Sequence, residues 1–117
     1  MAETETPAGQ RDLGGCRLTR HALGRFAERF GVDEDGAEVA LRASLSRARR
    51  LGRNRDNGAV AVLCVHASRV LIAIFQGDAC LTVLTWPQFE PRLREFGRVR
   101  LPRKRGRMIR RLEGTGE

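Results

Sequence analysis

Hydrophobic positions recur every three to four residues in the first half of the chain, which is typical of amphipathic helices. In residues 19–30 this repeat follows Thr19, a favourable helix N-cap, and stops at Gly31, which allows a left-handed C-cap. A second repeat begins near Asp33, where acidic residues suit the positive end of a helix, and stops before Gly52. The pattern predicts two helices, with apolar stripes formed by Ala22, Leu23, Phe26, Ala27 and Phe30 and by Ala37, Leu41, Leu45 and Ala48.

From residue 59 onward the period of the hydrophobic positions changes to two, which indicates β-strands. The dipeptides at 67–68 and 77–78 separate the apolar runs and suit two-residue hairpin turns. The first turn would place His66 opposite Arg69, and the register of the following strands would depend on it. We therefore expect a three-stranded antiparallel meander made of AVAVLCVH, RVLIAIFQ and ACLTVLTW.

The predicted register leaves apolar side chains on both faces of the meander. We expect the face with more of them to pack on the two helices, and it carries Ala61, Leu63, Val65, Val70, Ile72, Ile74, Leu81 and Val83. On the opposite face only the last cross-strand row is polar enough for chemistry. The four rows expected there are Val60–Phe75–Cys80, Val62–Ala73–Thr82, Cys64–Leu71–Leu84 and His66–Arg69–Trp86.

These elements predict one α+β domain, in which two N-terminal helices pack on the meander. A chain of 117 residues has room for one modest core, which we place in residues 17–97. Residues 1–16 are polar and contain glycine and proline, so we expect a flexible leader. After the last strand, Pro87 and Pro91 indicate a short helix or turn, and residues 98–117 form a basic C-terminal tail.

The net charge of the chain predicts that this domain binds polyanions. There are 22 basic and 14 acidic residues, giving a formal net charge of +8. Residues 92–111 hold ten cations against the single carboxylate of Glu95, so the tail is the strongest candidate for binding a phosphate backbone. An acidic protein partner or a merely solvated extension would satisfy the same composition. The predicted nucleic-acid contacts are Arg98, Arg100, Arg103, Lys104, Arg105, Arg107, Arg110 and Arg111.

No run of apolar residues approaches the ~20 needed to cross a bilayer, and the first residues are acidic and polar. We therefore expect a cytoplasmic protein with no membrane contact. Cys16, Cys64 and Cys80 have no CxxC spacing, which favours buried thiols over metal ligands. In the predicted register Cys64 and Cys80 are too far apart for a disulfide. We expect neither a metal nor another cofactor.

One segment of the chain points to a family. The motif His21-Ala22-x-x-Arg25-x-x-x-Arg29-x-Gly31, followed by an acidic second helix and by a last strand ending in Thr-Val-x-Thr-Trp, resembles small bacterial proteins related to RelE- and BrnT-type ribonuclease toxins. The resemblance covers about residues 17–86. It implies metal-independent RNA cleavage, with RNA rather than DNA, or the ribosome, as target and an antitoxin as protein partner. Trp86 stands where a tyrosine would be usual, so no phenol hydroxyl is available there.

The first candidate catalytic group lies on the first predicted helix. His21, Arg25 and Arg29 recur at four-residue spacing and so share one helical stripe. A histidine in the first turn feels the positive end of the helix, which favours the neutral imidazole that a general base needs. The two arginines can hold a phosphate. The alternative is a solvated polar stripe in which Glu28 pairs with one arginine.

The second candidate catalytic group is the last predicted row of the meander. There His66 would move a proton, Arg69 would hold phosphate and Trp86 would stack on an unpaired base. The alternative is a sheet-edge pair beside a turn, with Trp86 buried as an anchor for the C-terminal segment. The sequence alone does not decide between these two interpretations.

Two functions of different classes follow from these observations. The first is an RNA- or ribosome-binding protein similar to RelE and BrnT, with metal-independent endoribonuclease activity as a toxin. The second is a non-catalytic module that binds nucleic acid through basic side chains, or an accessory protein of a phage or mobile element that inhibits a host protein. The first is our leading hypothesis; the second is motivated by the absence of tyrosine and by the presence of only two histidines and one lysine.

Overall fold

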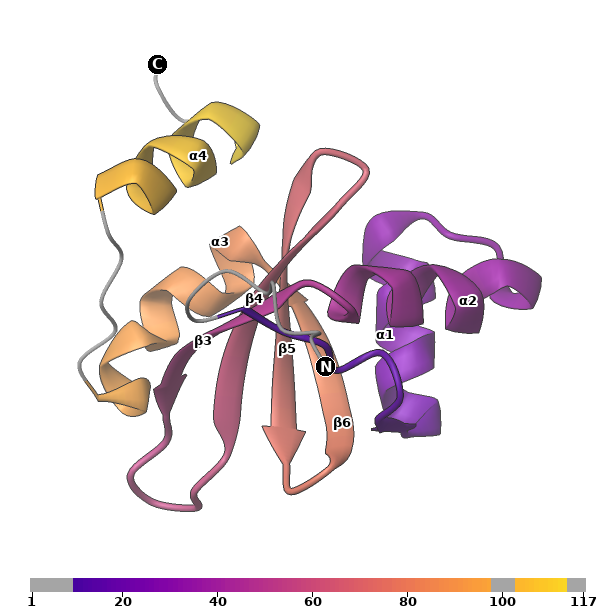
Figure 1. Cartoon of the computed structure of the whole chain (residues 1–117), viewed down its shortest axis with the longest axis horizontal. Helices are drawn as coiled ribbons and strands as arrows, with labels where there is room; N and C mark the ends of the chain where they lie inside the picture. Colours follow the sequence, from indigo (N-terminus) through magenta and orange to yellow (C-terminus); the bar gives the residue numbers. More distant parts are fainter. Residues whose placement is uncertain (1–9, 98–102, 114–117) are drawn as a thin grey trace, which may run out of the picture.

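The computed structural model describes residues 10–97 and 103–113 and shows an α+β protein (Figure 1). Six strands form one sheet, and helices cover both of its faces. In chain order the elements are β1 (Gln10–Arg11), β2 (Arg17–Leu18), α1 (Arg20–Phe30), α2 (Glu34–Leu45), β3 (Ala48–Arg53), β4 (Val60–His66), β5 (Arg69–Gln76), β6 (Ala79–Thr85), α3 (Trp86–Phe89), the 3₁₀ helix η1 (Glu90–Phe96) and α4 (Arg103–Glu113).

The predicted meander forms the middle of a larger sheet whose strand order is β1-β3-β4-β5-β6-β2. Strands β4, β5 and β6 pair antiparallel as expected. Three further strands, which the sequence pattern did not predict, extend the sheet on both sides, and β2 pairs with β6 in parallel. The predicted number of strands is therefore wrong, whereas the predicted α+β class is confirmed.

Helix α1 begins and ends where the sequence predicts. The Thr19 hydroxyl accepts a hydrogen bond from Ala22 N at 3.0 Å and donates to Cys80 O, also at 3.0 Å, so the cap ties the helix to β6. Gly31 ends the helix in the left-handed conformation, with φ of 65°. Asp33 caps α2 through a hydrogen bond from Asp35 N at 3.3 Å.

Helix α2 ends earlier than predicted, at Leu45, and the expected continuation toward Gly52 is wrong. The Ser44 and Ser46 hydroxyls donate to carbonyl oxygens of the last turn, at 3.2 and 2.6 Å. The chain then becomes β3, because pairing with β4 supplies its hydrogen bonds. In the sequence Ala48 continues the helical repeat, but in the structure it is buried as a residue of β3.

The two faces of the sheet are covered in the opposite way to the prediction. Helices α1 and α2 pack on the face that carries Val62, Cys64 and Leu71, whereas α3, η1 and α4 cover the face that carries Leu63 and Ile72 (Figure 1). Apolar density could not decide the matter, because both faces are buried. The aromatic residues after β6 fill the second core, which contains Leu51, Ala59, Ala61, Leu63, Val70, Ile72, Ile74, Leu84, Trp86, Phe89, Phe96 and Ile109.

The register of β4 and β5 is confirmed from the turn upward. Ala67 and Ser68 both have positive φ, as the predicted two-residue turn requires, and His66 lies opposite Arg69. The row Val60–Phe75–Cys80 also forms. Beyond it Leu81 is an extra residue in β6, since Phe75 pairs with Cys80 and Ile74 with Thr82. The shift is why the predicted partners of Ala73 and Leu71 are wrong: they face Val83 and Thr85.

Both regions predicted to flank the domain contain ordered elements. In the expected leader, Gln10 and Arg11 pair with β3; its residues 1–9 lie outside the described part of the chain. In the expected tail, α4 packs on the second core through Met108, Ile109 and Leu112. In the parts of the chain that are described, no helix has the length and apolar character needed to span a membrane.

Candidate nucleic-acid interface

The predicted stripe on α1 places its three side chains in three different environments. His21 is exposed in the first turn, and Arg25 forms an ion pair with Glu28 at 2.8 Å. Arg29 donates to the carbonyl oxygen of Val83 at 2.7 Å and so fastens α1 to β6. The stripe therefore works as a solvated helix face with one internal ion pair and one bond to the sheet.

His66 and Arg69 join the β4–β5 hairpin to the end of α1. The ring of His66 meets Phe26 and Phe30 edge-on, with centroids 5.0 and 6.0 Å apart, and its Nδ1 lies 3.4 Å from the Ser44 hydroxyl. The Arg69 guanidinium lies 4.6 Å from the centroid of the Phe30 ring and donates to the Arg29 carbonyl at 3.2 Å. These contacts fasten the β4–β5 hairpin to the end of α1, which indicates a structural role for both side chains.

Trp86 does not join His66 and Arg69, so the predicted row is wrong. Strand β6 ends at Thr85, and Trp86 begins α3 on the face opposite to His66. It is 7% exposed and packs against Phe89 at a centroid distance of 6.1 Å. Its place in the core agrees with the alternative interpretation, an anchor for the C-terminal segment.

The two histidines lie toward opposite ends of α1. His21 is in the first turn, whereas His66 packs against Phe26 and Phe30 in the second half of the helix. The ring nearer to His66 is that of Phe26, which lies about 7.5 Å along the axis from His21 and about 140° around it. His21 is exposed, whereas the ring of His66 packs against buried aromatic rings, so the two imidazoles do not face one shared site.

The predicted tail contacts divide into three groups. Arg107, Arg110 and Arg111 are exposed and share one face of α4, turned away from the buried Ile109. Arg103, Lys104 and Arg105 lie within the bounds of α4, but their side chains are outside the described structure. Arg98 and Arg100 lie outside the described residues altogether. The helix is held to the sheet by Glu113, which accepts a hydrogen bond from Val70 N at 3.1 Å.

The sequence of residues 52–58 indicates a basic loop, but their part in a basic surface on β3, which a β-bulge creates, was not predicted. Arg50 pairs with Val62 and Arg53 pairs with Val60, so that Leu51 and Gly52 together oppose Ala61. Two residues three positions apart would normally point to opposite faces of a strand. Here the extra residue brings both arginines to the face on which Val60 and Val62 pack.

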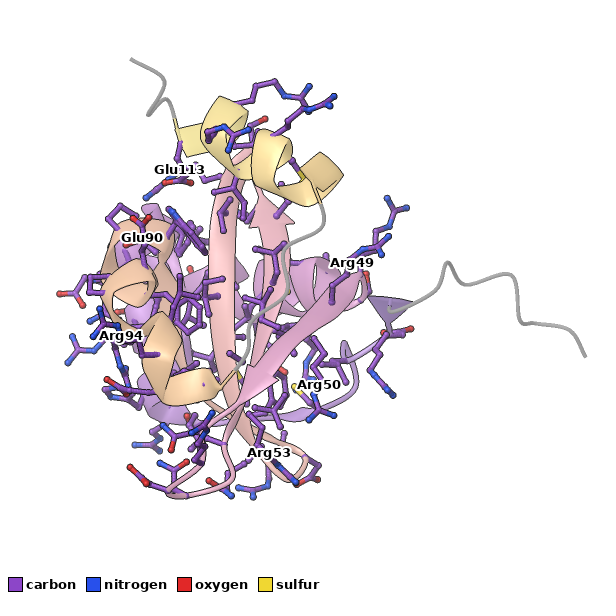
Figure 2. The ribbon with its side chains drawn as sticks, turned by 90° about the vertical axis from the view of Figure 1, so that its left-hand side faces the viewer. Arg49, Arg50, Arg53, Glu90, Arg94 and Glu113 are labelled. Carbon is purple, nitrogen blue, oxygen red and sulfur yellow. The ribbon has the colours of Figure 1, made fainter. Side chains whose placement is uncertain are left out.

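Two more arginines extend this surface. Arg11 in β1 pairs with Ala48, which is buried on the same face, and Arg55 follows β3 in the loop to β4. We call Arg11, Arg50, Arg53 and Arg55 the β3-edge arginines. All four are exposed, and within the described residues none of their side chains takes part in an ion pair or a hydrogen bond. Figure 2 shows Arg50 and Arg53 at the edge of the sheet.

Three of the β3-edge arginines surround an open hollow of about 550 Å³ between β3 and the end of η1. Gly52 makes this approach possible, because a Cβ atom there would overlap the carbonyl oxygen of Phe96. Arg55 N donates to Glu95 O at 3.4 Å, which holds the loop against η1. The hollow is lined by Arg50, Leu51, Gly52, Arg53, Arg55, Phe96 and Gly97.

The loop that carries Arg55 is shaped by a buried asparagine. Asn54 accepts hydrogen bonds through its Oδ1 from Asp56 N at 2.8 Å and from Asn57 N at 3.3 Å. Asn54 N donates to Ala59 O at 2.7 Å. These bonds occupy the amide oxygen of Asn54 and hold Arg55 beside the hollow.

The cysteines show no sign of reactive chemistry. Burial raises the pKa of Cys64 and that of Cys80 to about 12, so both stay protonated at neutral pH. All three cysteines are free thiols. The described residues contain no group of three or more His, Cys, Asp and Glu side chains with the geometry of a metal site.

No protein-family model, curated protein or solved structure matches the chain. The geometry alone therefore has to carry the functional argument. The sequence contains a signal for the strand that carries this surface: two arginines lie between Ala48 and Leu51, and Gly52 follows. A glycine inside a strand pattern indicates a bulge or a close backbone approach, and here it marks both.

Proposed function

We propose that the protein binds nucleic acid without cleaving it, through contacts between the β3-edge arginines and phosphate groups. The observation that carries this proposal is the bulge that turns Arg50 and Arg53 to one face of β3, beyond the part of the strand that pairs with β1. No carboxylate of the described residues pairs with them there. An exposed guanidinium that forms no ion pair keeps its full charge and its hydrogen-bond donors. Such groups are suited to phosphate oxygens, which they can bind in a bidentate manner.

The arginines of α4 form a second basic group, on the opposite face of the sheet. Arg107, Arg110 and Arg111 are exposed on a helix that is itself fixed to the sheet, so they present charge from a defined position. The preference for RNA or the ribosome over DNA comes from the resemblance to RelE- and BrnT-type proteins and stays a prediction. An acidic protein such as an antitoxin would compete for the same arginines.

Ribonuclease activity has less support than binding. The resemblance implies general acid–base cleavage, but the histidines lie at opposite ends of α1 and Trp86 is buried on the other face. Arg29 and Arg69 are occupied by carbonyl oxygens of the protein itself. We therefore expect no cleavage of RNA by the purified protein without metal.

Two variants with equal charge change test the proposal. Arg50→Gln with Arg53→Gln removes two charges from the β3 edge. Arg17→Gln with Arg20→Gln removes two exposed charges from β2, at the opposite edge of the sheet, and from the start of α1. The probe is a fluorescent RNA hairpin with a base-paired stem, titrated by anisotropy from 50 to 300 mM salt.

We expect the β3 variant to bind roughly 10- to 100-fold more weakly at 0.1 M salt, because two phosphate contacts and their released counterions are lost. The slope of log K against log salt should fall by about 2. The control variant should stay within about threefold of the unmodified protein. Equal losses in both variants would show that total charge alone matters, and an unmodified protein that does not bind would refute the proposal.

A further inference from the structure

The surface around the β3-edge arginines offers no aromatic ring to a nucleic-acid base. Proteins that bind single strands stack unpaired bases on exposed aromatic side chains. In residues 10–97 and 103–113 every aromatic side chain of this type is buried, and Phe96, which lines the hollow, is 1% exposed. The buried rings are Phe26, Phe30, Phe75, Trp86, Phe89 and Phe96.

Apart from its arginines, the hollow has no polar side chain among the described residues of its lining. Its polar lining side chains are the guanidinium groups of Arg50, Arg53 and Arg55, and its apolar lining residues Leu51 and Phe96 are buried. Asn54, the nearest carboxamide in the chain, is buried and holds its own loop. Guanidinium groups without an exposed aromatic ring beside them favour a ligand that displays phosphates and keeps its bases stacked inside.

The β3-edge arginines offer phosphate-binding groups at a fixed spacing. Arg50 and Arg53 take same-face positions on a strand, which lie about 7 Å apart. Their face of the sheet is the one on which α1 and α2 pack, whereas α4 covers the opposite face. The ligand of the β3 edge therefore follows from these arginines, without α4.

We infer that the β3 edge binds double-helical nucleic acid, along the phosphates of one strand. This inference rests on the proposed function and names its ligand. A rigid duplex displays its phosphates at a regular spacing, which suits arginines that are held at fixed positions on a strand. Contacts to phosphates carry no base information, so recognition is independent of base sequence.

The test compares ligands with the same number of phosphates. The ligands are a 12-bp RNA duplex, the 12-bp DNA duplex of the same sequence, and an unstructured 24-nucleotide oligouridine. Each is titrated by fluorescence anisotropy at 0.1 M salt against the full chain, Arg50→Gln/Arg53→Gln and Arg17→Gln/Arg20→Gln. A second RNA duplex of unrelated sequence measures base specificity.

We expect one or both duplexes to bind at least tenfold more tightly than the single strand, with the two RNA sequences within about threefold of each other. The preference for duplex should fall in the β3 variant and persist in the control, because a uniform polycation effect would not depend on which arginines are removed. Equal or tighter binding of the single strand, still lost in the β3 variant, would overturn the duplex assignment while the proposed function stands. Unchanged binding by the β3 variant would overturn the proposed function itself.

Discussion

The α1–α2 layer and the β3 edge both contain many arginines, but they use them differently. Residues 19–46 hold four arginines and five carboxylates, and residues 47–58 hold five arginines and one aspartate. In the first region Arg25, Arg29 and Arg42 are bound to side chains or carbonyls of the protein. At the β3 edge Arg50 and Arg53 have no such partner among the residues that the structure describes. Composition shows that carboxylates balance the arginines in the first region but not in the second, and the contacts show which arginines are bound within the protein and which are available.

Secondary structure explains much of this difference. On a helix, residues three or four apart are neighbours, so carboxylates can pair with arginines within the same element. Arg25 with Glu28, and Arg42 with Glu38, at 2.8 and 3.0 Å, are pairs of this kind. Among the described residues, the part of β3 beyond Arg49 has no partner strand on its β1 side, and the nearest carboxylate in the sequence, Asp56, lies beyond the strand. Charge placed there is left for a ligand.

The largest expected effect comes from the helical layer. Phe26 is fully buried between α1 and the sheet and contacts the rings of Phe30 and His66. Phe26→Ala should lower the free energy of unfolding by about 3–5 kcal/mol, because it leaves a cavity. Urea unfolding followed by circular dichroism measures this loss.

Phe26→Ala also tests whether the helical layer takes part in binding. Nucleic-acid affinity of the folded fraction should be unchanged, because Phe26 lies in the core on which α1 packs and does not line the β3 hollow. Phe26→Leu, which leaves a smaller cavity, provides a folded form if the alanine variant does not fold. A tenfold loss of affinity in folded Phe26→Leu protein would contradict the division of roles.

The second prediction concerns the bulge at the β3 edge. Gly52→Ala should lower the free energy of unfolding by about 1–3 kcal/mol, since its Cβ would overlap the Phe96 carbonyl and the neighbouring backbone has to move. It should also weaken RNA binding, because the hollow and the positions of Arg50 and Arg53 depend on this approach.

Gly24→Ala is the matched control for this substitution. A Cβ at position 24 meets open space in the middle of α1, so alanine should stabilise the helix by about 1 kcal/mol and leave binding unchanged. Thermal unfolding and anisotropy titrations of both variants provide the comparison. Equal stability changes at the two glycines would show that β3 and η1 do not approach each other as closely as described.

Local signals in the sequence were enough for several elements. Thr19 and Gly31 mark the ends of α1 because capping depends on neighbouring residues alone. The turn at Ala67 and Ser68 is predictable because these two residues interrupt two apolar runs, and it determines the pairing of β4 with β5. In these cases the physical cause lies within a few residues of the sequence.

The β3 surface could not be predicted in the same way, because its causes are distant in the chain. Ala48 continues the helical repeat of α2, and only pairing with β4 and β1 turns the segment into a strand. The bulge that aligns Arg50 with Arg53 depends on register with Ala61 and on the approach of Phe96 to Gly52. Likewise, two apolar faces gave no basis for choosing which one the helices cover.

The smallest expected effect distinguishes two exposed arginines by what they touch. Arg69 packs over the Phe30 ring and donates to the Arg29 carbonyl at the C-terminal end of α1. Arg69→Gln should therefore lower the free energy of unfolding by about 1 kcal/mol, from the lost cation–π contact and the lost charge at the negative end of the helix. Arg50→Gln should change stability by less than about 0.5 kcal/mol, since it breaks no contact among the described residues.

Binding should show the reverse order for the same pair. Arg50→Gln removes a phosphate contact and should weaken RNA binding several-fold, while Arg69→Gln leaves affinity within about threefold because its guanidinium is already engaged by the protein. Both substitutions remove one charge, so urea unfolding and anisotropy titrations of the two variants can be compared directly. If Arg69→Gln weakens binding as much as Arg50→Gln does, the joint between α1 and the hairpin belongs to the interface, and availability of charge does not separate the two regions.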